Sequence, residues 1–190
     1  ETLYPSSFIA AEPVLRRRLR FALPSTRVYD AVAVSADMPM EDEFAVAALS
    51  GCSHLLRYAF SRDWDSLERF LTLKRAPDAE VEAWCCAMRQ FTRTLTLHHG
   101  ARLVLKSPPH TAKVPHLLAL FPDARFVFVH RHPFEVYVSM QRMLSVAIPA
   151  ASFHARASWP EPERAIVGTF REMTRAYLDA RPSIPPGRLV

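Results

Sequence analysis

The segment ARLVLKSPPHTAKVPHLLALFPDARFVFVHRHPFEVYVSMQR, residues 101–142, decides the predicted fold. Its two short apolar runs, residues 103–105 and 126–129, are each followed by polar or charged residues and proline. Runs of this length are too short for a helix and are typical of buried strands in a parallel sheet. After each run the chain continues into a predicted helix, over about residues 111–121 and 133–144. The segment therefore predicts the order strand, polar turn, helix, repeated twice.

The rest of the chain is predicted to be mainly helical. The strongest pattern covers residues 78–98, where Trp84, Met88 and Phe91 recur at spacings of three and four, and Gly100 follows. Weaker patterns predict helices over 44–49, 63–73 and 163–180, and a surface loop over 145–161. Together with the two strands they predict one α/β domain over residues 1–190, with its core strands at 101–145 and a helical, substrate-facing part at 1–100.

Composition and charge exclude several classes of function. The net charge is +5, but the arginines are spread along the chain without a nucleic-acid recognition motif, so we expect no nucleic-acid partner. Three cysteines without a CxxC pair predict neither a disulfide framework nor a zinc site, and they favour a cytoplasmic location. No run approaches the roughly 18 apolar residues of a membrane span. We expect no bound metal.

Basic residues gather where the two predicted strands end. Lys106 and His110 follow the first strand, and Arg131 follows the second. Open parallel sheets bind ligands beyond the carboxyl ends of their strands, where helix N-termini favour anions. The pattern therefore predicts an anionic, phosphorylated ligand.

Arg131 and Ser139 form the most informative pair. Pro133 suits the first turn of a helix, which places Arg131 at the end of the strand and Ser139 within the first two helical turns. A guanidinium fork forms bidentate, charge-assisted bonds, and a hydroxyl adds a further donor. The two side chains therefore suit a terminal phosphate group.

Three motifs in this segment resemble the sulfotransferases that use 3′-phosphoadenosine 5′-phosphosulfate (PAPS). The first is Arg131 with a serine eight positions later, although His132 stands where that family commonly has aspartate. The second is Leu-Lys-Ser-Pro-Pro-His-Thr at 105–111, which looks like the Lys-Ser-Pro segment of the bacterial and carbohydrate branches. The third is Phe-Pro-Asp-Ala-Arg-Phe at 121–126. The resemblance implies a P-loop nucleoside-kinase-like, three-layer α/β/α fold with a parallel sheet.

The resemblance also implies roles for individual residues. Arg131 and Ser139 would bind the 3′-phosphate of PAPS, and Lys106 would face the sulfonate or the bridging oxygen. His110 is the first candidate for the base that takes the acceptor's proton, with Glu41 and Glu43 as rivals. The acceptor would be a hydroxyl or amine compound, either a small molecule or a glycan or lipid.

One part of the family pattern is missing from this sequence. The family's phosphosulfate-binding loop, of the Pro-Arg-Ser-Gly-Thr type, has no counterpart among the four glycines of the chain. We therefore expect a domain that is incomplete at both ends, with the loop upstream of Glu1. Two other functions stay open: a non-catalytic nucleotide-binding or interaction protein that keeps only the 3′-phosphate pocket, and a kinase-like P-loop protein.

Overall fold

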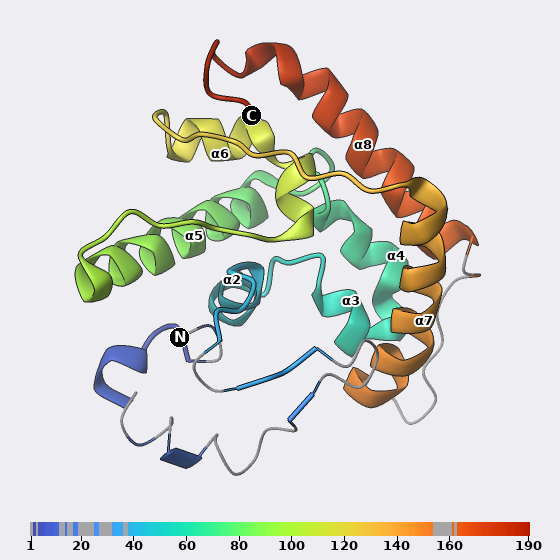
Figure 1. The fold of residues 1–190 in the computed structure, drawn as a ribbon, viewed down its shortest axis with the longest axis horizontal. Coiled ribbons are helices and arrows are strands. Elements are labelled where there is room, and N and C mark those ends of the chain that lie inside the picture. The colour runs from blue at the N-terminus through green and yellow to red at the C-terminus, as the bar shows by residue number, and fades with distance from the viewer. Residues whose placement is uncertain are drawn as a thin grey trace.

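The computed structural model describes residues 2, 4–11, 14, 17–18, 25–26, 32–35, 38–153, 161 and 163–190, and helices dominate them (Figure 1). The α-helices are α2 (Glu43–Ser50), α3 (Leu56–Ala59), α4 (Trp64–Leu67), α5 (Asp78–His99), α6 (Val114–Leu120), α7 (Pro133–Ala151) and α8 (Thr169–Ala180). Short 3₁₀ turns are η1 (Ser61–Asp63), η2 (Glu68–Phe70), η3 (Pro108–Ala112) and η5 (Arg181–Ser183), and η4 (Glu163–Gly168) is a π-helical turn.

The predicted three-layer α/β/α fold is wrong for the described residues. They contain two isolated β-bridges, one antiparallel between Thr26 and Ala33 and one parallel between Phe126 and Leu189, and no sheet. Residues 103–105 have no regular secondary structure. A strand is stable only beside a neighbour that takes its backbone hydrogen bonds and covers its side chains. Val104, Val127 and Val129 are instead largely exposed.

The second apolar run does find one partner. The Phe126 N–H donates to the Arg188 carbonyl at 2.7 Å, and the Val190 N–H donates to the Phe126 carbonyl at 2.9 Å. A third bond, from the Phe128 N–H to the Val190 carbonyl, measures 3.2 Å. The parallel direction of this contact agrees with the sequence pattern, but a single bridge does not make the predicted sheet.

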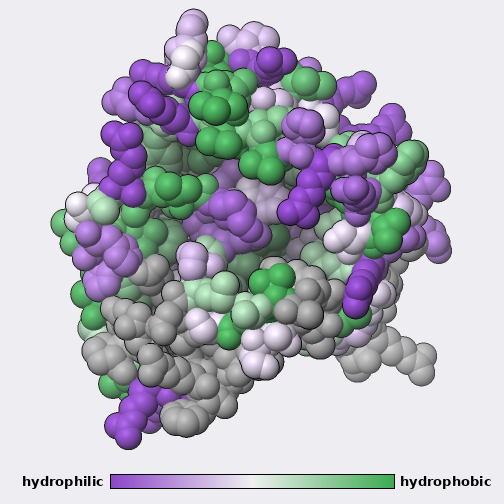
Figure 2. All heavy atoms as spheres, in the orientation of Figure 1, coloured by the Kyte–Doolittle hydropathy of each residue, from purple (hydrophilic) through white to green (hydrophobic). Residues whose placement is uncertain are grey.

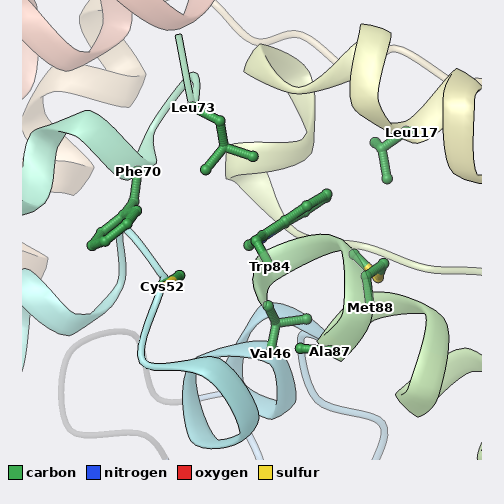
Figure 3. Packing of buried hydrophobic residues seen from close by; sticks show 8 residues of the cluster. All are labelled: Val46, Cys52, Phe70, Leu73, Trp84, Ala87, Met88 and Leu117. Carbon is green, nitrogen blue, oxygen red and sulfur yellow. The ribbon is translucent and has the colours of Figure 1, made fainter. Parts of the chain in front are cut away.

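The main hydrophobic core surrounds α5, as the helical spacing predicted. Trp84 and Met88 are fully buried and pack with residues of α2, α6 and the segment between α4 and α5 (Figure 3). Phe91, one turn further on, belongs to a second cluster beneath the N-terminal segment. The helix ends where Gly100 adopts a left-handed conformation with φ 62° and its N–H bonds to the Thr96 carbonyl. The predicted end at Gly100 is confirmed.

The other long helix, α7, runs further than predicted. We expected a loop after residue 144, yet α7 continues through Pro149 to Ala151. Leu144 and Ile148 lie one turn apart and both face a buried cluster with Trp64 of α4. Their burial stabilises the extra turns. The rest of the predicted loop includes residues 154–160, which lie outside the described residues.

The predicted helix over 63–73 is broken into the short pieces α4 and η2. Four consecutive residues, from Phe70 to Leu73, are all buried. A regular helix turns each successive side chain by about 100°, so one buried face cannot hold four in a row. The chain therefore leaves the helix, and Leu73 takes a positive φ of 62°.

Candidate functional site

Three consecutive carboxylates meet three basic side chains from the turn after residues 103–105. We call these three pairs the acid–base row. Lys106 Nζ lies 2.6 Å from Glu41 Oε1, His110 Nε2 lies 2.6 Å from Asp42 Oδ2, and Lys113 Nζ lies 2.7 Å from Glu43 Oε1. The row therefore joins the start of α2 to the turn that carries the predicted Lys106 and His110.

The local sequence explains why the three basic residues face the same way. Ser107 is extended, and the two prolines after it begin η3 rather than a regular helix. The α-helix starts only at Val114, with Pro115 in its first turn and Lys113 as its N-cap residue. The turn thus presents residues 106, 110 and 113 toward α2, and the predicted helix over 111–121 is shorter than expected.

The row runs from solvent into the core. In the outer pair the side chains of Lys106 and Glu41 are 75% and 24% exposed. In the middle pair His110 and Asp42 are 14% and 4% exposed. The inner pair is fully buried. Figure 2 shows hydrophilic side chains gathered in the middle of one face, bordered by hydrophobic ones.

The inner pair is held by two further contacts. The Ser53 hydroxyl donates to Glu43 Oε1 at 3.0 Å. The Lys113 ammonium lies 4.7 Å from the centre of the Trp84 ring, a cation–π contact. A buried ion pair is tolerated only when extra hydrogen bonds and close geometry offset the loss of hydration. Glu43 meets that condition at Oε1, which takes both bonds, whereas Oε2 is buried without a hydrogen-bond partner among the described residues.

The row separates the three candidate bases by access. Glu43 is sealed in the core. His110 Nε2 forms a hydrogen bond with Asp42, and His110 Nδ1 is buried without a hydrogen-bond partner among the described residues. Glu41 borders solvent, where it also accepts from the Ser107 hydroxyl at 3.3 Å. Of the three, Glu41 is the side chain that an incoming molecule reaches first.

Arg131 and Ser139 lie at the start of α7, and both are exposed. Within the described part of the chain Arg131 forms no hydrogen bond or ion pair. No side chain caps α7, whose first residue is Pro133. The first N–H groups of this 19-residue helix therefore remain open. No hydrogen bond or ion pair between described residues links either side chain to the acid–base row.

The positive charge of Lys113 also reaches the buried His54 and the half-buried His116. Burial, with the charges of Arg57 and Lys113, holds the pKa of His54 well below its usual value. Burial first and Lys113 second lower the pKa of His116. Both imidazoles are therefore neutral near pH 7.

Sequence reasoning placed Lys106 and His110 correctly at one turn but missed their partners. Asp42, Lys113 and Ser53 are not among the residues that the sequence predicts for the site. A signal was available in the spacing of the basic residues, at intervals of four and three, opposite an unbroken run of three acidic residues.

Neither a metal cluster nor a membrane-spanning helix occurs among the described residues. No group of three or more His, Cys, Asp or Glu side chains is arranged to hold a metal ion. Among the described helices, none combines the length and apolar character that crossing a membrane requires.

Comparison with known proteins identifies the family. Residues 12–190 match the model of the sulfotransferase family. The chain belongs to this family. The chain is similar to the omega-hydroxy-beta-dihydromenaquinone-9 sulfotransferases Stf3 of Mycobacterium bovis and Mycobacterium tuberculosis, each 26% identical over 188 residues. The resemblance noted on residues 101–142 is therefore confirmed at the level of the family.

These matches cover 99% of this chain but only 48% of each relative. The chain thus spans about half the length of the curated relatives it matches. No solved structure matches it.

Proposed function

We propose that the full-length protein transfers a sulfuryl group from PAPS to a hydroxyl acceptor. The observation that carries the proposal is Arg131, an exposed guanidinium without an internal partner, eight residues before an exposed serine on an uncapped helix. By contrast, Lys106 and Lys113 are both paired with carboxylates of the chain itself.

The start of α7 supplies three features that favour a phosphate. The guanidinium gives charge-assisted, bidentate bonds. The free N–H groups and the dipole of a long helix favour an anion at its N-terminus. The Ser139 hydroxyl, on the second turn, adds a donor. We assign this place to the 3′-phosphate, the group that distinguishes PAPS from adenosine 5′-phosphosulfate.

The outer pair of the row is proposed to meet the sulfonate. Lys106 and Ser107 already hold the carboxylate of Glu41. A sulfonate offers the same donors a similar set of oxygens. Donor binding would therefore compete with Glu41 for Lys106 and release the glutamate.

The proposed reaction is an in-line displacement at sulfur. The acceptor oxygen forms a bond to sulfur, the bond from sulfur to the phosphate oxygen of the donor breaks, and adenosine 3′,5′-bisphosphate leaves. The acceptor proton passes to a base of the protein. The sequence favoured His110 for this role, and that prediction stands untested, but access favours Glu41.

Two variants separate these bases. If Glu41 is the base, Glu41→Gln lowers turnover by roughly two to four orders of magnitude, whereas His110→Gln, whose amide nitrogen stands near the Nε2 position that faces Asp42, has a smaller effect. The reverse order would assign the base to His110. Bisphosphate binding in each variant shows whether the donor site is intact.

The acceptor is proposed to be an apolar molecule that carries a hydroxyl group. The names of both Mycobacterium relatives describe a hydroxylated menaquinone derivative as their acceptor. In this chain Met38, Met40 and Phe44 are exposed on either side of the acidic run. Methionine side chains adapt to apolar surfaces of varied shape. These three side chains therefore suit the apolar body of an acceptor whose hydroxyl reaches Glu41.

The test is transfer of label from ³⁵S-PAPS by the full-length protein to long-chain primary alcohols and ω-hydroxylated prenyl lipids, with water-soluble sugars and amines as comparison acceptors. The proposal predicts labelled sulfate ester on the apolar alcohols and none in the Arg131→Ala variant. Tight bisphosphate binding without transfer to any acceptor would favour the non-catalytic binding protein. Competition by ATP as strong as that by the bisphosphate would favour the kinase-like alternative.

A further inference from the structure

The three pairs of the acid–base row require a particular register between α2 and the turn that faces it. Because the three acidic residues are consecutive, a slip of α2 by one residue would bring Asp42 to Lys113 or Glu43 to His110. Charge alone does not exclude such a slip, because each wrong pairing still places a carboxylate beside a basic group. Something else in the structure has to select the observed pairing.

The outer and middle pairs select the register weakly. An exposed ion pair contributes about 0–1 kcal/mol because water screens it, and Lys106 is largely exposed. Asp42 and His110 form a single hydrogen bond, with Asp42 Oδ1 left without a partner among the described residues.

The inner pair selects the register strongly. Glu43 and Lys113 are both fully buried, so a slip that separates them would strand a charge in the core. The neighbouring side chains also favour the carboxylate at the position of Glu43 and the ammonium at the position of Lys113. Ser53 donates to the carboxylate, and the face of Trp84 attracts the ammonium. The observed arrangement of the two elements makes all of these contacts.

We propose that Glu43 and Lys113 are positioning residues, whose buried pair sets the register that holds Asp42 on His110 and Glu41 on Lys106. The inference rests on the proposed function only where turnover is measured. Buried polar groups are known to specify register in other folds, often at a cost in stability. Here the register would place the solvent-facing end of the row for the reaction.

The experiment replaces both charges in the full-length protein, as Glu43→Met with Lys113→Met. Exchanging a buried ion pair for apolar side chains of similar length is often neutral or stabilising, so the double variant should fold. Its matched control is Arg69→Met with Glu80→Met, which removes another pair beside the same core, at 2.7 Å and partly exposed. The first readout is the ¹⁵N NMR signature of the His110 imidazole, which reports its bond to Asp42.

A positioning role predicts that the double variant keeps its helical content and unfolding midpoint, loses the His110 signature and falls about 100-fold in turnover, as for misplaced reacting groups. The control variant should keep the His110 signature and the turnover of the wild type. A folded double variant with the wild-type His110 signature would overturn the proposal, whatever its turnover. Because that signature requires no sulfate transfer, it tests the positioning role even if the proposed function fails.

A second variant covers the case in which the double variant does not fold. Glu43→Asp keeps the charge but shortens the side chain by one methylene, so pairing with Lys113 must draw the start of α2 closer to the turn. The expected results are an altered His110 signature and lower turnover. An unchanged signature in folded Glu43→Asp would equally overturn the proposal.

Discussion

The turn at residues 106–113 and the start of α7 both carry basic residues after an apolar run, yet the structure treats them in opposite ways. In the turn, Lys106, His110 and Lys113 are each paired with a carboxylate of α2 or its leading residues. At the start of α7, Arg131 has no such partner among the described residues. The first region is organised by charges of the chain itself, and the second is open to charge from a ligand.

We expect the paired residues of the turn to contribute to stability and the unpaired Arg131 to contribute to ligand binding. Breaking a buried pair costs the folded state free energy, because the remaining charge stays in the core. Removing an exposed, unpaired group costs the fold little, so any effect should appear when a ligand binds. Four variants test this division, and we take them from the largest expected effect to the smallest.

The inner end of the row should dominate stability. Lys113→Met leaves the Glu43 carboxylate buried without its cation, so the free energy of unfolding should fall by about 3–5 kcal/mol. Urea unfolding followed by circular dichroism measures this loss. A fall below about 1 kcal/mol would mean that the pair contributes no more than a surface ion pair.

A substitution at the start of α7 should change ligand affinity but not stability. Ser139→Ala removes one hydrogen bond to a charged phosphate, worth about 1.5–3 kcal/mol, so bisphosphate affinity should fall by roughly tenfold or more. The unfolding midpoint should not move. Ser145→Ala, an exposed serine on the same helix, is the matched control. Equal affinities in the two variants would remove Ser139 from the site.

The buried histidine near Lys113 should make stability depend on pH. The pKa of His54 in the fold lies well below 6.5, chiefly because of its burial. The unfolded chain therefore takes up a proton that the folded chain does not. Its contribution to stability is intact above pH 6.5 and is lost as the pH falls below it, by at most about 1.4 kcal/mol per pH unit.

The measurement for this prediction is the urea midpoint between pH 7.5 and 5. His54→Gln should flatten the dependence, and the exposed His99→Gln should leave it unchanged. If the slope in His54→Gln equals that of the wild type, another group causes the acid sensitivity, and His116 is the first to examine because burial lowers its pKa too.

The outer end of the row should have the smallest effect on stability. Lys106→Met removes an ammonium that is 75% exposed, so the free energy of unfolding should change by less than about 1 kcal/mol. Turnover should nevertheless fall, because the proposed sulfonate contact is lost. A stability loss as large as that of Lys113→Met would contradict the gradient from solvent to core.

Local pattern was sufficient to predict the long helices. The spacing of Trp84, Met88 and Phe91 located α5, and Gly100 located its end. Pro133 located the start of α7, whose far end depends instead on Leu144 and Ile148 meeting Trp64 from a distant segment. Such long-range packing leaves no local signal.

The parallel sheet failed for the same physical reason. A short apolar run indicates the side chains that a strand needs, but strands also need neighbours, and sequence does not supply them. Val104 and Val127 are exposed among the described residues, and the second run pairs there only with residues 188–190, through the bridge at Phe126 and one bond from Phe128. The candidate basic residues still follow the two runs and precede a helix, because this part of the chain does not depend on the sheet.

The sequence proposes only part of the candidate site. Lys106, His110, Arg131 and Ser139 became candidates through spacing and family resemblance, since each lies in a compact motif, and their roles stay predictions. Asp42 bonds to His110, 68 residues away, and Lys113 bonds to Glu43, 70 residues away. No local rule predicts either pair.

The most direct test of the central claim is calorimetric binding of adenosine 3′,5′-bisphosphate and adenosine 5′-monophosphate to the full-length protein and to Arg131→Ala. The control is Arg93→Ala, which removes an exposed arginine of α5. If Arg131 binds the 3′-phosphate, the wild type and the control should bind the bisphosphate more tightly than the monophosphate by about 2–4 kcal/mol, or roughly 30- to 1,000-fold. In Arg131→Ala that difference between the two nucleotides should disappear. A gain of the same size in Arg131→Ala, or none in the wild type, would contradict the account.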